Sequence, residues 1–184
     1  MIWSLARCHT LLSAHKKSAG LSSADCGTDT IQGTVKDQRN NMTAYSYLEA
    51  AETAAAWILD HLTNSTMHLH TGYLDGTAGI PGKLDDYVFL IKGLIELYKA
   101  TLTLRWLEGA VRLSEVLLSE FFDEIHGGFY AYGMHDEKLL VRKKEAFDGG
   151  TPSGNSLACG ILYDLFHYTG QIHYQKAWTK QIPT

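Results

Sequence analysis

A short sequence pattern occurs three times along this chain, and each copy begins a helix with one apolar side. The copies occupy residues 47–51, 106–110 and 174–178, so they recur about every 60 residues. The second and third copies each follow an apolar stretch of helical length and a short turn. The repeating unit is therefore predicted to be a helical hairpin, with one helix apolar nearly all round and the other on one side.

The difference between the two helices of each hairpin constrains how the hairpins assemble. A helix that is apolar all round must be covered on most sides, whereas a one-sided helix can face water. Two concentric rings meet both needs, so we expect an all-α fold built as an α/α toroid, with a flat solenoid as the alternative. The chain holds about three hairpins and closure needs about twice that number, so a partial toroid with apolar surface at both ends is expected.

Apolar periodicity and breaker residues set the expected boundaries. Residues 1–12 are predicted to be a truncated inner helix, residues 13–42 a disordered polar insertion, and residues 43–184 the partial toroid. One small β-hairpin is predicted from residues 127–133 and 138–142. The helices predicted within the toroid span residues 45–62, 85–102, 105–122, 153–168 and 174–180.

Composition and charge argue against several classes of protein. The chain has 184 residues, a net charge of −4 and a pI near 6.1, which provide no basic surface for nucleic acid. No apolar run reaches the roughly 18 residues needed to cross a bilayer, and the first residues lack the order of a secretory signal. We therefore expect no nucleic-acid or membrane partner and favour a cytoplasmic location.

The cysteines and histidines do not form a recognisable metal or disulfide pattern. Cys8, Cys26 and Cys159 are odd in number and lack CxxC spacing, so reduced thiols are expected. His68 and His70 alternate as on a strand, but no cysteine or carboxylate lies near them in sequence. No metal and no cofactor are predicted.

Two turns rich in glycine and proline lead into helices and carry acidic residues at the point of entry. The first runs from residue 79 to 89 and contains Asp85 and Asp86; the second runs from residue 147 to 156 and contains Asp148. Acidic side chains at helix starts cap free backbone N–H groups and suit the helix dipole, so capping is the simplest interpretation. The alternative is a polar site shared by two neighbouring helix starts.

Four motifs, in their order and spacing, give the chain a family resemblance. Residues 47–51, 82–87, 127–130 and 148–156 resemble the spermatogenesis-associated thioredoxin-like protein family, and the resemblance extends over about residues 44–180 plus Met1 to Cys8. It implies an N-terminal thioredoxin-like domain followed by a six-hairpin, glycosidase-like α/α toroid related in fold to the sugar 2-epimerases. This chain departs from that pattern, because it has no thioredoxin-like domain and about half of the toroid. We therefore expect it to be a fragment of a longer protein.

In a toroid of this kind, the starts of the inner helices surround a central funnel, so the two acidic turns would face one cavity. Carboxylates flanking a sugar can act as acid and base or as acid and nucleophile. Aromatic rings can stack on a sugar and polar side chains can bind its hydroxyl groups. The predicted catalytic residues are Asp85, Asp86 and Asp148, and the predicted substrate-binding residues are Tyr87, Tyr130, Ser153, Asn155 and Ser156.

The functional hypothesis that follows is a carbohydrate-related binding or catalytic activity, inferred from the fold, with a small-molecule sugar as the ligand. If the domain is an enzyme, a glycosidase-like or sugar-epimerase-like activity is expected. The first alternative is a non-catalytic protein-interaction module linked to redox regulation, whose partner is another protein or the missing remainder of the toroid. The second alternative is an inactive fragment.

Overall fold

The computed structural model describes residues 44–134 and 141–182 and contains five helices in that part of the chain. The predicted helix at residues 1–12 and the predicted insertion at residues 13–42 lie outside the described residues. Each of the five predicted helices is confirmed within about two residues. They are α2 (Ala44–His61), α3 (Leu84–Thr101), α4 (Leu104–Phe121), α5 (Gly154–Thr169) and α6 (Ile172–Gln181).

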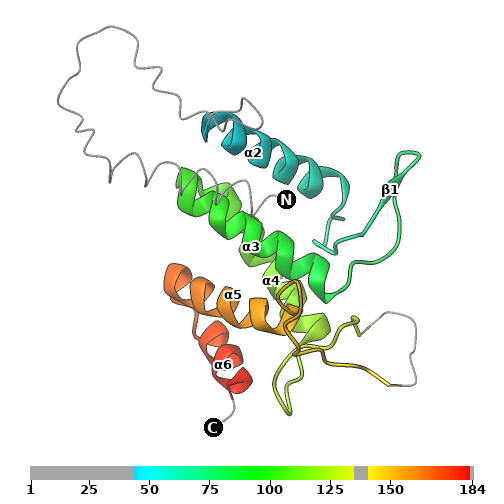
Figure 1. Cartoon of the computed structure of the whole chain (residues 1–184), viewed down its shortest axis with the longest axis vertical. Helices are drawn as coiled ribbons and strands as arrows, with labels where there is room; N and C mark the ends of the chain where they lie inside the picture. The colour runs from blue at the N-terminus through cyan, green and yellow to red at the C-terminus, as the bar shows by residue number, and fades with distance from the viewer. Residues whose placement is uncertain (1–43, 135–140, 183–184) are drawn as a thin grey trace, which may run out of the picture.

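The helices form two layers, as the hairpin repeat predicted. Figure 1 shows α2 at one end, α6 at the other, and α3, α4 and α5 between them. On the outer layer, the Trp106 Nε1 atom of α4 donates to Glu52 Oε1 of α2 at 3.3 Å, and the Tyr174 hydroxyl of α6 donates to Glu115 Oε1 of α4 at 2.6 Å. These bonds make α2, α4 and α6 neighbours, and the inner helices α3 and α5 pack beside them.

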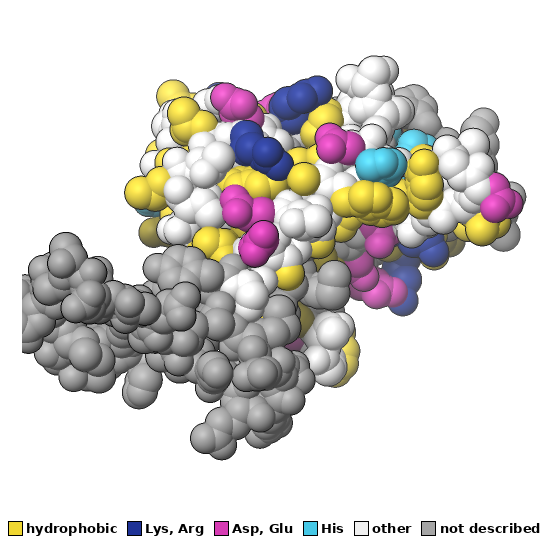
Figure 2. Space-filling view, turned by 90° about the horizontal axis from the view of Figure 1, so that it is seen from above, with side chains coloured by type: hydrophobic (Ala, Val, Ile, Leu, Met, Phe, Trp, Pro, Cys, Tyr) yellow, Lys and Arg dark blue, Asp and Glu magenta, His cyan; other side chains and the backbone are white. Residues whose placement is uncertain are grey.

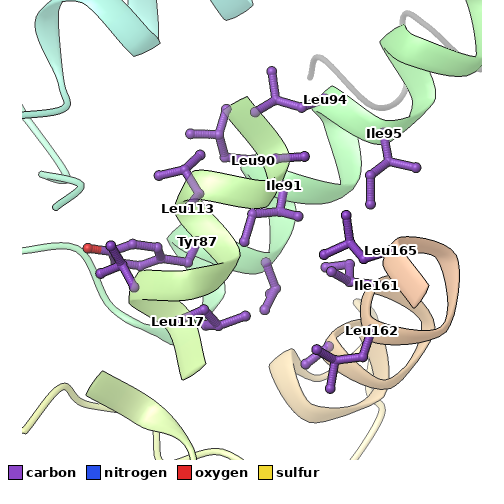
Figure 3. Packing of buried hydrophobic residues seen from close by; sticks show 14 of the residues in the cluster. Tyr87, Leu90, Ile91, Leu94, Ile95, Leu113, Leu117, Ile161, Leu162 and Leu165 are labelled. Carbon is purple, nitrogen blue, oxygen red and sulfur yellow. The ribbon is translucent and has the colours of Figure 1, made fainter. Parts of the chain in front are cut away.

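The core lies around α3, which is covered on almost every side. Ten of its 18 residues are buried, against five of the 16 in α5. Figure 3 shows Ile91 and Ile95 of α3 facing Ile161 and Leu165 of α5. These four side chains are fully buried, and removing each from water contributes roughly 1.5–3 kcal/mol. The interdigitated aliphatic contact therefore fixes the spacing of the two inner helices.

Charged side chains join the same two helices farther from their starts. Lys92 and Lys99 of α3 both contact Asp164 Oδ2 of α5, at 2.9 and 3.1 Å, and both contact Glu96 Oε1, at 3.4 and 3.0 Å. Glu96 is buried, so its charge requires these cations. The pKa of Lys99 is raised, although burial opposes this, by its hydrogen bonds to Glu96 and Asp164. The network fixes the register of α3 against α5.

The two-stranded hairpin of the structure lies elsewhere than the predicted one. Strands β1 (Tyr73–Leu74) and β2 (Thr77–Ala78) pair antiparallel, with Tyr73 opposite Ala78, in the loop between α2 and α3. Residues 135–140 of the predicted hairpin lie outside the described residues, and its described residues contain no strand. The backbone N–H of Ala131 does donate to the Lys143 carbonyl at 2.8 Å, so the two arms meet. The N–H of Phe129, two residues before Ala131, donates instead to the Asn155 side chain of α5. This bond prevents a regular ladder of strand hydrogen bonds between the two arms.

No helix among the described residues is long and apolar enough to cross a membrane. Figure 2, a view onto the α2 end, shows acidic and basic side chains spread among hydrophobic ones on the face that it presents. The described part of the molecule is thus a two-layer helical array with a charged surface.

Candidate functional site

Three predicted site residues, Asp85, Asp86 and Tyr87, lie in the first turn of α3, and each has a different role there. Asp86 Oδ2 accepts a hydrogen bond from the backbone N–H of Lys83 at 2.8 Å, which closes the first turn of the helix. Tyr87 points into the core, where its hydroxyl accepts from the backbone N–H of Leu69 at 2.8 Å and its ring packs 5.2 Å from that of Phe121. Asp85 is the exposed one of the two aspartates, and its carboxyl makes no hydrogen bond or ion pair with another described residue.

The start of α5 is held by a network of three of the predicted residues. The backbone N–H of Ser156 donates to Ser153 Oγ at 3.2 Å, so Ser153 caps the helix. Asp148 Oδ1 accepts from the Ser153 N–H at 2.8 Å, and Asp148 Oδ2 accepts from the Ser156 hydroxyl at 3.1 Å. The Ser153 N–H bond, followed by the Ser156 bond, lowers the pKa of Asp148. Asp148 therefore stays ionised as a structural acceptor.

The two helix starts lie against one another, as the sequence suggested for a shared site. A methyl group added at Gly154 would come within 2.6 Å of Asp85 Oδ1 and 2.8 Å of Leu84 Cδ2. A larger residue would have to displace these two side chains, so Gly154 leaves room for the Asp85 carboxyl at the first turn of α5. The backbone N–H of Leu84 also donates to the Ala131 carbonyl at 3.2 Å, which ties the same point to the segment after α4.

Asp85 has an electrostatic environment unlike that of the other two aspartates. Burial against its neighbours raises its pKa first, and the negative charges of Glu145 and Asp86 raise it further. Glu145 itself accepts a hydrogen bond from Lys143 Nζ at 2.6 Å. The site thus places Asp85, whose pKa is raised, near Glu145, whose carboxylate is bound by Lys143.

Asn155 positions the segment that carries Glu145. Its Oδ1 accepts from the Phe129 N–H at 2.7 Å, and its Nδ2 donates to the carbonyls of Phe129 and Glu145, at 2.9 and 2.8 Å. Three of its hydrogen-bonding positions are therefore used by the protein. Asn155 was predicted to bind substrate; the structure places its amide in a joint between α5, residue 129 and residue 145.

A second polar cluster, centred on Asp123, lies next to Tyr130. Asp123 is 7% exposed and accepts from Lys144 Nζ at 2.6 Å, from the Tyr130 hydroxyl at 2.8 Å, and from the backbone N–H groups of Ile125 and His126 at 2.9 and 3.1 Å. The Lys144 bond, then the His126 N–H and the Tyr130 hydroxyl, hold the pKa of Asp123 far below its ordinary range.

The same cluster occupies Tyr130, which was predicted to stack on substrate. Its hydroxyl is bound to Asp123, and the Arg142 guanidinium carbon lies 4.0 Å from the centre of its ring. The hydrogen bond to Asp123 raises the pKa of Tyr130. Sequence reasoning missed Asp123, Lys144 and Glu145. A signal for Asp123 was present, because an Asp that begins a turn commonly accepts backbone N–H groups, and Gly127 and Gly128 mark a turn four residues after it.

Asn155 and Ser156, both predicted to bind substrate, line a cavity of about 510 Å³. The cavity lies between the start of α5, the 126–128 turn and the end of α6. Tyr87 lines a different cavity, of about 340 Å³, with His68, His70 and Glu120. Among the described residues no group of three or more His, Cys, Asp or Glu is arranged to hold a metal ion. The residues lining the first cavity are His126, Gly127, Gly128, Lys144, Ala146, Asn155, Ser156, Cys159, Lys180 and Gln181.

Comparison with curated proteins finds relatives that are similar to about half of this chain. Spermatogenesis-associated protein 20 of Mus musculus is 37% identical over 90 residues, which is 48% of this chain. The chain is similar to spermatogenesis-associated protein 20. The matched segment spans 11% of the mouse protein, so this chain corresponds to a small part of that relative. The resemblance predicted from the four motifs is confirmed, while its thioredoxin-like component stays a prediction. No family model matches the chain.

Solved structures confirm the fold class. A D-mannose isomerase superposes with a TM-score of 0.60 at 18% identity, over 74% of this chain and 36% of the isomerase. The cellobiose 2-epimerase from Spirochaeta thermophila superposes with a TM-score of 0.57 at 20% identity, over 98% of this chain and 41% of the epimerase. At these identities the likeness shows an α/α toroid architecture, and this chain spans well under half of each solved toroid.

Proposed function

We propose that this chain forms part of a carbohydrate-binding or carbohydrate-processing domain in which Asp85 is the acid. The observation that carries the proposal is the free carboxyl of Asp85, which lies where two inner helices begin and does not cap either of them. Asp86 and Asp148, by contrast, each accept backbone N–H groups. The two solved neighbours that process sugars, a mannose isomerase and a cellobiose epimerase, support the choice of ligand class.

The environments of Asp85 and Glu145 suit general acid and base roles. A pair of carboxyl groups can divide acid and base roles between them, one donating a proton and the other accepting one. Burial raises the pKa of Asp85, and Glu145 accepts a hydrogen bond from Lys143 Nζ at 2.6 Å. A protonated Asp85 can donate to a sugar oxygen, and an ionised Glu145 can accept a hydroxyl proton.

The first test is a titration of the protein with mannose and with cellobiose. Binding is measured from the NMR chemical shifts of residues at the starts of α3 and α5. Sugar sites of this open kind are expected to bind in the millimolar range, so concentrations up to about 50 mM are needed. We expect binding to the parent protein and a loss of about tenfold or more in Asp85→Asn. Asp86→Asn is the matched control, because it alters a cap one residue away and should retain binding.

Two results would reject the proposal. The first is the absence of any shift at residues 84–86 and 153–156 with either sugar. The second is equal binding by the parent and Asp85→Asn, which would place the ligand elsewhere. A pKa of Asp85 measured by carboxyl NMR at or below that of Asp148 would remove the acid role independently of the ligand.

A second candidate function, a protein-interaction module, is favoured by a separate observation. Large hydrophobic side chains are exposed at both ends of the helical array, including Trp57 on α2 and Tyr163 on α5. Exposed aromatic residues are typical of protein interfaces. These ends do not include Asp85, so an interaction role and a sugar site are compatible in one domain.

A further inference from the structure

Tyr132 lies beside the start of α3, next to the residues that carry the candidate site. The carbonyl of Ala131, the residue before it, accepts a hydrogen bond from the backbone N–H of Leu84 at 3.2 Å. The Nζ atom of Lys83, the residue before Leu84, lies 5.2 Å from the centre of the Tyr132 ring. These two contacts place Tyr132 against the two residues that immediately precede Asp85 in the chain.

The backbone of Tyr132 is held in place independently of its side chain. Its carbonyl accepts from Arg142 Nη2 at 3.0 Å, and the same nitrogen donates to the Glu120 carbonyl of α4 at 3.2 Å. The Ala131 N–H donates to the Lys143 carbonyl at 2.8 Å. Hydrogen bonds to main-chain groups of residues 131 and 132 therefore fix the point from which the ring projects, and they remain when the side chain of Tyr132 is changed.

The side chain of Tyr132 is used less by the protein than those of the two tyrosines predicted to bind substrate. The hydroxyl of Tyr87 accepts from the Leu69 N–H, and the hydroxyl of Tyr130 donates to Asp123. Tyr132 is half-buried, and within the described part of the chain its hydroxyl makes no hydrogen bond and no other aromatic ring packs against it. Its ring and hydroxyl are therefore open to a ligand.

Charged side chains connect Tyr132 to the acid and the base of the proposed site. The pKa of Lys143 is raised, first by its hydrogen bond to Glu145 and to a smaller extent by Tyr132, so the phenol lies within electrostatic range of the Lys143 ammonium. Burial raises the pKa of Asp85 first, and the charge of Glu145 raises it next. Tyr132, Lys143, Glu145 and Asp85 are thus successive neighbours beside the starts of α3 and α5.

We propose that Tyr132 is the aromatic platform of the candidate site, on whose ring face a pyranose stacks while Asp85 and Glu145 face the sugar from the side. This inference rests on the proposed function and assigns to Tyr132 the stacking role that was predicted for Tyr87 and Tyr130. An aromatic face carries partial negative charge and the C–H groups of a sugar carry partial positive charge, so the two surfaces attract.

Lys83 supports the platform in two ways. Its ammonium lies over the Tyr132 ring, within the roughly 6 Å at which an aromatic face attracts positive charge. Lys83 is exposed and makes no ion pair with another described residue, so its side chain can turn to the rim of the ring. There it donates a hydrogen bond to a hydroxyl group of the stacked sugar.

The experiment is a cellobiose titration, followed by NMR, of the parent protein and of variants at residue 132. Tyr132→Phe keeps the ring and should bind within about twofold of the parent, whereas Tyr132→Ala should bind about tenfold or more weakly. Tyr132→Leu keeps apolar bulk without an aromatic face and should match Tyr132→Ala. Tyr73→Ala is the matched control, because Tyr73 is 41% exposed on β1 and should not affect binding.

A second readout reports the stacking itself. Protons above an aromatic ring are shielded by its ring current, so the C–H protons of bound cellobiose should shift upfield with the parent protein and with Tyr132→Phe. The upfield shift should be absent with Tyr132→Ala and Tyr132→Leu. A loss of affinity caused only by altered packing would not distinguish the phenylalanine and leucine variants in this way. Circular dichroism checks that each variant keeps its helices.

The outcomes separate this inference from the proposed function. Binding that is lost in Asp85→Asn but unchanged in Tyr132→Ala and Tyr132→Leu would overturn the platform and leave the proposed function standing. A loss in Tyr132→Phe as large as that in Tyr132→Leu would also overturn it, because the hydroxyl rather than the ring face would then be the contact. A parent protein that binds no cellobiose would overturn the platform together with the sugar site.

Discussion

The amide of Asn155 binds both backbone groups of Phe129, accepting from its N–H at 2.7 Å and donating to its carbonyl at 2.9 Å. Phe129 is fully buried, so these two backbone groups are bound by a side chain where a strand partner would otherwise be needed. One residue of α5 thereby fixes the loop between α4 and α5, and through the Glu145 carbonyl it also fixes the acidic side of the candidate site.

Replacing Asn155 with alanine should destabilise the protein by about 2–3 kcal/mol, because two buried backbone groups lose their partners. The measurement is urea unfolding monitored by circular dichroism. Ser156→Ala is the matched control: its hydroxyl is exposed and bonds only within the cap network, so it should cost less than about 1 kcal/mol. Equal effects of the two substitutions would contradict the joint described for Asn155.

Gly127 is expected to tolerate no side chain. Its φ is +72°, and a methyl group there would overlap the carbonyl oxygen of Lys180 at the end of α6. Gly127→Ala should therefore cost at least about 2 kcal/mol, since backbone strain and a clash with main-chain atoms act together. Gly72→Ala is the control, because nothing lies within 4 Å of that position and its φ is ordinary; thermal melting should show little change.

Asp123 should make stability depend on acid pH. Its pKa is lowered in the folded protein, so its contribution is fully present above the unfolded value of about 3.9 and is lost as the pH falls below it toward the folded value. Unfolding free energies measured from pH 7 down to pH 2 should fall steeply in the parent protein. The fall should be shallower in Asp123→Asn and in Lys144→Met, which removes the main cause of the shift. An unchanged profile in both variants would contradict this role.

Asp85 should have the opposite effect on stability. Its pKa is raised in the folded protein, so its favourable contribution is present below about pH 3.9 and is lost as the pH rises through the folded pKa. Asp85→Asn should therefore be more stable than the parent protein at neutral pH and similar to it near pH 3. Asp148→Asn supplies the contrast, because the pKa of Asp148 is lowered and its neutral replacement should destabilise the protein at neutral pH. A loss of stability in both variants would show that Asp85 is a cap like Asp148.

The helical framework was predictable because its determinants are local. Apolar side chains that recur with the period of a helix, and the Gly170 that ends α5 with a φ of +69°, act within a few residues of one another. The placement of the β-hairpin was not predictable in this way. Residues 127–133 alternate as a strand does, but the Asn155 amide, 26 residues away from Phe129, takes the hydrogen bonds that a strand partner would need.

The candidate site was also predictable only where its determinants are local in sequence. The sequence predicted that acidic residues would lie at two helix starts, and it could not separate capping from catalysis, because an aspartate serves either role from the same position. The backbone N–H groups bound to Asp86 and Asp148 show that these two aspartates cap helices. Tyr87 is held by the backbone of Leu69, and Tyr130 is held by the side chain of Asp123. These partners are not adjacent in sequence to the tyrosines that they hold. Glu145 entered the site only through the folding of its segment onto Asn155.

The sequence by itself determined the repeated helical hairpin, the toroid class and the two acidic helix starts, because helix periodicity and capping are properties of neighbouring residues. Only the tertiary structure decided that Asp85 is the carboxyl left free and that its pKa is raised. A pKa depends on burial and on nearby charges, and here the packing of Gly154 against Asp85 and the binding of the Glu145 carbonyl by Asn155 set both.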